Sequence, residues 1–201
     1  MARHPVHVTQ RIAAGVLSDT GLPTLRRRDV YRIVRRAFVY GCQRDTHGGK
    51  FRICHYSVQR NHMHLIVEAD SEAALSRGMQ GFGIRVAKGI NRVLGRTGRV
   101  FDDRYHAQPV TSPRQARNAL TYVLLNAHKH GEPVTGPTDP FSSADYFDGF
   151  THATGPPADG DHDADPPVVS AQTWLLHTGW RRHGLISPFE TPGPCRRRRG
   201  R

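Results

Sequence analysis

Residues 51–67 read FRICHYSVQRNHMHLIV, and this stretch decides the fold. Aromatic and β-branched residues fill both halves, which predicts two β-strands, and only the pair Arg60-Asn61 separates them. So short a link indicates an antiparallel hairpin. Side chains two residues apart on a strand share a face. His62 and His64 therefore present two imidazoles on one face, while the apolar residues that alternate with them face a core.

The segments on either side of the hairpin predict the rest of one sheet. Residues 6–11 alternate as a strand does, and residues 100–110 predict a further strand. Apolar residues recur at steps of three and four after Asp29 and again after Ser71, and both of these residues are suitable helix N-caps. The order strand, helix, strand, strand, helix, strand is the ferredoxin-like pattern. We therefore predict an α+β fold: a ferredoxin-like βαββαβ antiparallel sheet with an appended C-terminal helix.

Local signals refine this outline. Glycines and a basic run predict a loop over residues 12–28. The pair Ser112-Pro113 is typical of a helix start and Gly131 of a helix end, so one continuous helix is predicted between them. The preceding long helix contains three glycines, which indicate close packing or a bend: Gly78, Gly81 and Gly83.

Composition divides the chain into four parts. Residues 1–150 contain the predicted domain. Residues 151–170 are acidic and rich in proline and glycine, which predicts a flexible linker. Residues 171–190 hold a short amphipathic segment that we expect to dock back onto the domain, and residues 191–201 form a basic tail with affinity for phosphate.

Charge and cysteine content narrow the class of protein. The formal net charge is +12, which favours polyanions such as nucleic acid. Apolar runs fall short of the roughly 18 residues that a membrane span needs, and the N-terminus lacks the apolar stretch of a secretory signal. An odd number of cysteines without C-x-x-C spacing indicates neither a disulfide framework nor a cysteine zinc site: Cys42, Cys54 and Cys195. We therefore expect a reducing, cytoplasmic, nucleoid-associated setting.

Tyr122 and Asn126 lie four residues apart on the last predicted helix, which places a phenol beside a carboxamide. The apolar stripe of this helix runs along another side, so the phenol is available for chemistry. Together with His62 and His64, the pair offers two metal ligands, a third candidate ligand and a nucleophile. Nitrogen and oxygen ligands of this kind suit Mg²⁺ or Mn²⁺. Such a set can attack a phosphodiester.

Three short blocks carry a resemblance to a known family: residues 61–66, 100–106 and 119–126. They resemble the conserved blocks of single-tyrosine insertion-sequence transposases, most closely the REP-associated tyrosine transposases, over roughly residues 6–131. The resemblance implies that His62 and His64 bind a divalent metal, that Tyr122 attacks single-stranded DNA, and that Asn126 is the third ligand.

The chain departs from the family pattern at several positions. Ala127 stands where the family usually has proline after the third ligand, and Ile12 stands where an Arg-Gly pair often continues. The second departure puts recognition of a DNA hairpin or guide sequence in doubt. Residues 151–201 have no counterpart in the pattern.

The predicted function is metal-dependent cleavage and strand transfer of single-stranded DNA through a 5′-phosphotyrosine intermediate, with Mg²⁺ or Mn²⁺ as cofactor. The predicted partner is single-stranded or hairpin DNA, and the protein is a monomer or a homodimer. Basic and aromatic side chains on the long helix and before the last strand are the candidate DNA contacts: Arg85, Lys88, Arg92, Arg104 and Tyr105.

Other interpretations of the same residues remain. The histidines can be a hydrogen-bonded structural pair, and Tyr122 can be an ordinary packing residue. A domesticated, non-catalytic regulator that binds DNA or RNA is the alternative function. A zinc hydrolase is a third possible function. Its only acidic candidate for a general base is Glu68, four residues from His64 on the same face of the strand. An RNA-binding domain of the RRM type is disfavoured, because the histidine strand lacks aromatic residues.

Overall fold

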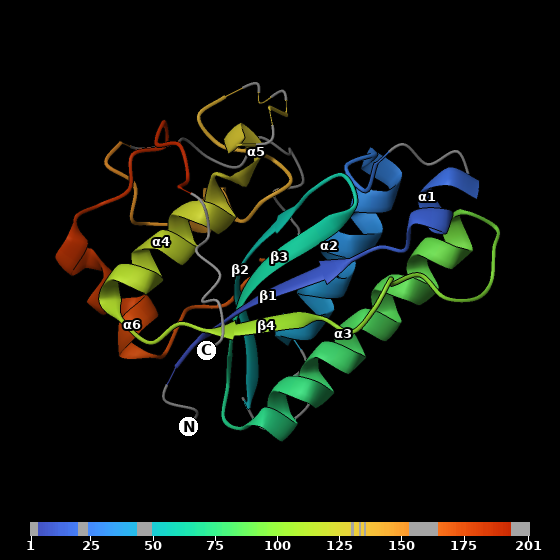
Figure 1. Ribbon diagram of the computed structural model, residues 1–201, viewed down its shortest axis with the longest axis horizontal. Coiled ribbons are helices and arrows are strands. Elements are labelled where there is room, and N and C mark those ends of the chain that lie inside the picture. The colour runs from blue at the N-terminus through green and yellow to red at the C-terminus, as the bar shows by residue number, and fades with distance from the viewer. Residues whose placement is uncertain are drawn as a thin grey trace, which may run out of the picture.

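The computed structural model describes residues 4–19, 24–43, 50–129, 131–132, 134, 136–152 and 165–193 (Figure 1). Four strands form one antiparallel sheet: β1 (Val6–Arg11), β2 (Phe51–Val58), β3 (His62–Ala69) and β4 (His106–Pro109). Their order in the sheet is β2-β3-β1-β4. Helix α2 (Arg28–Gln43) connects β1 to β2, and α3 (Glu72–Val93) connects β3 to β4. The α+β, ferredoxin-like prediction is confirmed.

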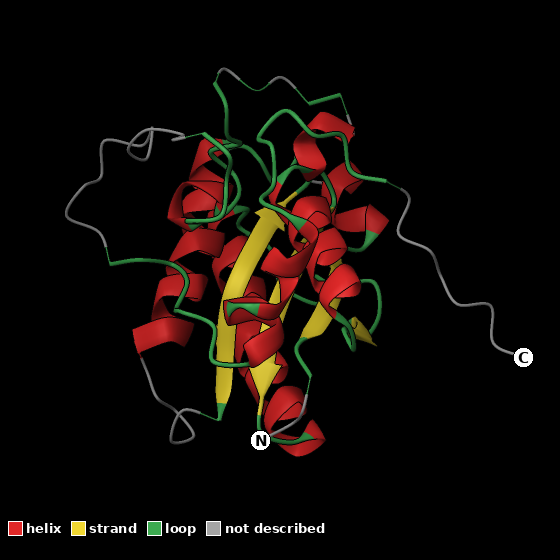
Figure 2. Ribbon diagram, turned by 90° about the vertical axis from the view of Figure 1, so that its left-hand side faces the viewer, coloured by secondary structure: helices red, strands yellow, loops and turns green. Residues whose placement is uncertain are grey.

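Helices cover both faces of the sheet (Figure 2). One face packs against α2 and α3 through a core that includes Val8, Met63 and Leu65. The opposite face packs against α4 (Pro113–Leu124) through a second cluster that includes Ile66 and Leu120. Since side chains alternate along a strand, the even-numbered β3 residues and the odd-numbered β1 residues face α4. This alternation places His62 and His64 under α4, which carries Tyr122 and is called the tyrosine helix below.

Close packing explains two of the glycines in α3. A Cβ added at Gly78 would overlap the ring of Phe51, and one added at Gly89 would overlap Cγ2 of Ile33 on α2. The close packing expected from Gly78 is therefore present. By contrast, a Cβ at Gly83 would meet Phe101 at 3.5 Å, an ordinary contact distance.

Three local predictions are wrong. The loop predicted over 12–28 contains a short helix, α1 (Ala14–Asp19), because burial of Val16 favours one amphipathic turn. The strand predicted over 100–110 is paired only from His106: the chain bends at residues 102–104, and before that bend Phe101 makes an isolated bridge. The helix predicted to run to Gly131 breaks at Leu125, with φ −111° and ψ 19°, and resumes as α5 (Asn126–Lys129).

The chain beyond α5 wraps around the sheet edge and the tyrosine helix. Ser142 bridges to Ser57 on the outer edge of β2, and Val169 N–H donates to Ile53 O at 3.1 Å on the same edge. Residues 171–190 contain α6 (Trp174–His177) and a 3₁₀ helix, η2 (Gly179–His183), which packs against α4. A shorter 3₁₀ helix, η1 (Ala144–Tyr146), precedes them.

Two predicted segments fall largely outside the described residues: positions 153–164 of the linker and positions 194–201 of the basic tail. In the part of the chain that is described, every helix is too short or too polar to cross a membrane.

Candidate functional site

The two histidines of β3 bring their ring nitrogens together. His62 Nε2 lies 3.0 Å from His64 Nε2, and the two rings are nearly perpendicular at 86°. His64 is buried and His62 is half-buried. At this separation two imidazole nitrogens cannot both point an unshared lone pair at each other. A proton or a cation must therefore lie between them. The contact suits a hydrogen bond between the two rings as well as two ligands directed at one ion.

Neighbouring side chains occupy the other nitrogen of each ring. His62 Nδ1 donates to Asn61 Oδ1 at 2.8 Å, since an amide oxygen can only accept. His64 Nδ1 lies 3.1 Å from Thr9 Oγ1 and 3.2 Å from His7 Nε2. These contacts follow from the β1–β3 register, in which Thr9 pairs with His64. Metal-binding histidines commonly have such an outer partner, which sets the tautomer and holds the ring.

Tyr122 lies against two of these imidazoles, those of His64 and His7. Its ring centroid is 5.0 Å from that of His64 and 5.6 Å from that of His7, both in edge-on contact. Lys129 Nζ lies 4.6 Å from the centre of the tyrosine ring. Tyr122 is half-buried and also packs against the second apolar cluster, so its ring is held in place by its surroundings. The structure thus brings together the phenol and the histidines within one chain.

Asn126 begins α5 and is fully buried. Neither its Oδ1 nor its Nδ2 has a hydrogen-bond partner among the described residues. An unpaired buried amide costs on the order of 2–7 kcal/mol, so a ligand for its oxygen would remove a real penalty. In the described part of the chain, no three His, Cys, Asp or Glu side chains gather around one point.

Burial also controls the charge of the neighbouring imidazole. The low-dielectric surroundings, and to a smaller extent His106, lower the pKa of His7 to about 4. His7 is therefore neutral at neutral pH.

Glu68 has a structural role. Its two carboxylate oxygens accept backbone N–H groups of Gln172 and Thr173, each at 2.8 Å, and Arg52 donates to it at 3.3 Å. The side chain is 1% exposed. Held by these groups at the far end of β3, it is not placed to act as a base beside His62. The zinc hydrolase interpretation loses its only acidic candidate.

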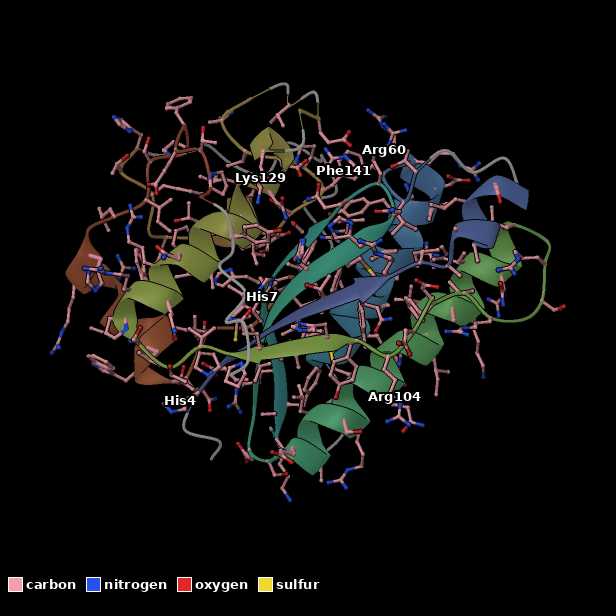
Figure 3. The ribbon with its side chains drawn as sticks, viewed as in Figure 1. His4, His7, Arg60, Arg104, Lys129 and Phe141 are labelled. Carbon is pink, nitrogen blue, oxygen red and sulfur yellow. The ribbon has the colours of Figure 1, made fainter. Side chains whose placement is uncertain are left out.

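The cations predicted to contact DNA do not gather at this site. Arg85, Lys88 and Arg92 lie on α3, which covers the opposite face of the sheet, and Arg85 stacks on the ring of Tyr40 at 4.1 Å. Arg104 is exposed in the bend before β4 (Figure 3), whereas Tyr105 packs against the core beneath α2 and α3.

Exposed cations that sequence reasoning missed lie on the site face. Arg11 pairs with His62 across the sheet, and Arg60 lies in the hairpin turn two residues before His62. Figure 3 shows Arg60 and Lys129 at the same end of the molecule as the hairpin turn. The position of Arg11 at the end of the first strand and the position of Arg60 in the hairpin turn were the available signals.

A separate cavity of about 540 Å³ lies between β2, residues 146–148 and the C-terminal segment. His55, Phe147 and Trp180 are among its lining residues, and it includes none of the four candidate site residues. This cavity is therefore distinct from the cluster of histidines and tyrosine beneath α4.

Comparisons with known proteins give one structural match. A REP-associated tyrosine transposase, solved bound to a REP hairpin, matches with a TM-score of 0.52 and 18% sequence identity, covering 85% of this chain and 95% of that one. At this identity the likeness establishes the fold. No family model matches the chain, and neither does any curated protein.

Proposed function

We propose that the protein cleaves and rejoins single-stranded DNA, with Tyr122 as the nucleophile and a divalent metal held by His62, His64 and Asn126. One observation carries the proposal: two imidazole nitrogens converge at 3.0 Å directly beside the ring of a tyrosine. The similar structure, a transposase bound to a DNA hairpin, agrees with it in fold.

The residues fit a metal ion in three respects. The two Nε2 atoms converge, the Nδ1 atoms are engaged elsewhere, and a buried amide oxygen lacks a partner. A bound Mg²⁺ or Mn²⁺ would polarise the non-bridging oxygens of the scissile phosphate.

The chemistry is a transesterification. The hydroxyl oxygen of Tyr122 forms a bond to phosphorus, and the bond from phosphorus to the 3′ oxygen breaks. The phenol loses its proton to solvent, and the departing 3′ oxygen gains one. The products are a 5′-phosphotyrosine and a free 3′-hydroxyl. Attack on the phosphotyrosine by a 3′-hydroxyl reverses the step, so rejoining needs no external energy source.

Exposed positive charges favour a DNA strand that crosses the face of the sheet beneath α4. Arg11, Arg60 and Lys129 are exposed: Arg11 pairs with His62 across the sheet, Arg60 lies in the turn two residues before His62, and Lys129 lies near the ring of Tyr122. Their charges would contact backbone phosphates on both sides of the scissile bond.

The decisive assay follows a covalent adduct. Single-stranded oligonucleotides, including hairpin-bearing ones, are incubated with the protein and Mn²⁺, and adducts that survive denaturation are separated by electrophoresis. A label at the 3′ end should remain with the protein, and a label at the 5′ end should be released. Tyr122→Phe should give no adduct. An adduct with the Phe variant would remove Tyr122 from its role, and binding without any adduct would favour a non-catalytic regulator.

A second measurement separates metal binding from DNA binding. His62→Ala should abolish adduct formation and leave DNA affinity nearly unchanged, because that affinity depends on arginine and lysine. Arg60→Gln and Lys129→Gln should each lower the slope of log affinity against log salt by about 0.7, the value for one phosphate of single-stranded DNA. Lys88→Gln, on the opposite face of the sheet, is the matched control and should leave the slope unchanged.

A further inference from the structure

Trp174 is a large aromatic side chain that lies at the surface. Tryptophan is highly buried on average in proteins, yet Trp174, the first residue of α6, is 49% exposed, whereas Trp180 is 1% exposed. The backbone just before the ring is fixed to the sheet, because the N–H groups of Gln172 and Thr173 donate to the buried carboxylate of Glu68 on β3, each at 2.8 Å. The fold therefore presents an indole to solvent on a rigid support.

A glycine and an arginine contact this indole. A Cβ added at Gly179 would lie 2.8 Å from Cζ3 of Trp174, so the glycine backbone packs closely against the ring. The guanidinium carbon of Arg182 lies 4.8 Å from the centre of the ring. Arg182 is itself exposed, and a cation over an exposed aromatic ring is held only weakly. The guanidinium can therefore leave the ring when a stronger partner for each group arrives.

The charge around this pair is positive. Residues 166–189 contain no acidic side chain, and they include His177, Arg181, Arg182 and His183. Arg181 donates to Asp148, whereas no carboxylate in the described part of the chain pairs with Arg182. An exposed aromatic ring beside an unpaired arginine suits a single nucleic-acid strand, since a base can stack on the ring while the cation contacts a phosphate.

Helix α6 lies on the same side of the sheet as the tyrosine helix. Leu175 and Leu176 of α6 share an apolar cluster with Leu120 of α4, and Figure 1 shows the two helices next to each other. The segment before α6 is attached at Glu68, six residues along β3 from His62. That distance is about 20 Å on the usual rise of a strand, which about six stacked nucleotides span. One DNA strand is therefore long enough to reach both places.

We propose that Trp174 and Arg182 form a second contact for single-stranded DNA, outside the catalytic centre. One base stacks on the indole in place of the guanidinium, and Arg182 turns to an adjoining phosphate. The exchange is favourable, because a stacked base strengthens binding by about 5- to 150-fold, whereas a cation on an exposed ring contributes about 2- to 5-fold. The inference rests on the DNA-binding part of the proposed function, and it needs neither the metal nor Tyr122.

Tryptophan fluorescence reports this contact without metal or cleavage. The chain has two tryptophans. An oligothymidylate of twice the length that spans the two places should quench the emission of exposed Trp174 and leave that of buried Trp180 unchanged. In Trp174→Phe, the remaining emission should not respond to the same DNA, although a labelled oligonucleotide still binds by fluorescence anisotropy. Quenching that persists in this variant would overturn the inference, because the signal would then come from Trp180.

Substitutions separate stacking from charge. Trp174→Ala should weaken binding by at least about 5-fold, and Trp174→Phe, which keeps an aromatic ring, should weaken it less. Arg182→Gln should lower the slope of log affinity against log salt by about 0.7. Phe189→Ala is the matched control, because Phe189 is 72% exposed in the same segment and no cation of the described residues lies over it. This control should leave affinity and slope unchanged.

The outcomes distinguish the inference from the function it rests on. If the oligonucleotide binds without quenching Trp174, and folded Trp174→Ala binds it as tightly as the unsubstituted protein does, the inference fails and DNA binding elsewhere stands. Quenching by DNA, in a protein that gives no covalent adduct with Mn²⁺, would support the contact and contradict the proposed cleavage. If the oligonucleotide does not bind at all, both proposals fail.

Discussion

A buried ion pair anchors the chain segment that follows the tyrosine helix. Arg26 donates to both carboxylate oxygens of Asp139, each at 2.8 Å, and the two side chains are 7% and 2% exposed. The guanidinium also donates to Val58 O at 3.1 Å and stacks on the ring of Phe141 at 4.3 Å. The pair joins the chain just before α2 to residues 136–143 along the edge of β2.

Asp139→Asn should lower the free energy of unfolding by about 3–5 kcal/mol, because it removes the nearer, bidentate counter-charge of a buried guanidinium and leaves the more distant Glu132, whose Oε2 lies 3.8 Å from Arg26 Nε. The amide retains one oxygen acceptor, which places the expected loss near the lower end of that range. A typical domain has about 5–15 kcal/mol of stability, so the variant should remain folded without denaturant. Urea titration followed by circular dichroism measures the difference.

The matched control is the other Arg–Asp pair of the C-terminal region. Arg181 donates to Asp148 at 3.0 Å, but the carboxylate is 87% exposed. Asp148→Asn should therefore change stability by about 1 kcal/mol or less. Equal losses in the two variants, or a loss below about 1 kcal/mol for Asp139→Asn, would show that the Arg26 pair is not desolvated and does not anchor this segment.

Two further predictions concern pH and helix packing. Burial lowers the pKa of His55 to about 4 from its usual 6.5. Between these pH values the unfolded chain binds a proton that the folded chain does not, so the free energy of unfolding should fall as the pH is lowered from 6.5 to 4. His55→Asn should make this fall in the urea midpoint less steep, and an unchanged dependence on pH would contradict the assignment to His55. Gly89→Ala, whose added Cβ would overlap Ile33, should lower the free energy of unfolding by about 1–3 kcal/mol through overpacking. Gly83→Ala has room for its methyl group and should raise the free energy of unfolding by up to about 1 kcal/mol. Urea titration measures both changes.

Sequence periodicity was sufficient for the sheet and the two helices between its strands, because each of these elements buries a regular stripe. The β2–β3 hairpin follows from two apolar strands with a two-residue link, and its alternation alone places His62 and His64 on one face. The break at Leu125 was not predictable in this way: residues 113–130 lack an internal helix-breaking residue, and the interruption arises where Asn126 is drawn into the interior.

Strand pairing explains what was missed at the site. His7 and Thr9 are unremarkable in the sequence, and only the β1–β3 register brings them to Nδ1 of His64. The basic side of α3 was visible as a stripe, but a stripe does not reveal which face of the sheet its helix covers. Because α3 packs on the face of the sheet opposite α4, Lys88 and Arg92 are separated from the histidines.

The helix that carries Tyr122 is held on its own sheet by residues beyond 131. Arg117 donates to both carboxylate oxygens of Glu190, at 2.8 and 2.9 Å, and Trp180 is 1% exposed in the cluster behind α4. A buried tryptophan covers about 150–250 Å², worth on the order of 4–6 kcal/mol at 25 cal/mol/Å². Exchange of α4 alone with a second subunit would break these contacts, and the segment that makes them is itself tied to β2, where Val169 N–H donates to Ile53 O. We therefore expect each chain to use its own tyrosine. The test mixes His62→Ala with Tyr122→Phe by joint refolding. Recovery of covalent adduct in the mixture would contradict the expectation, because only an exchanged helix would restore a complete site.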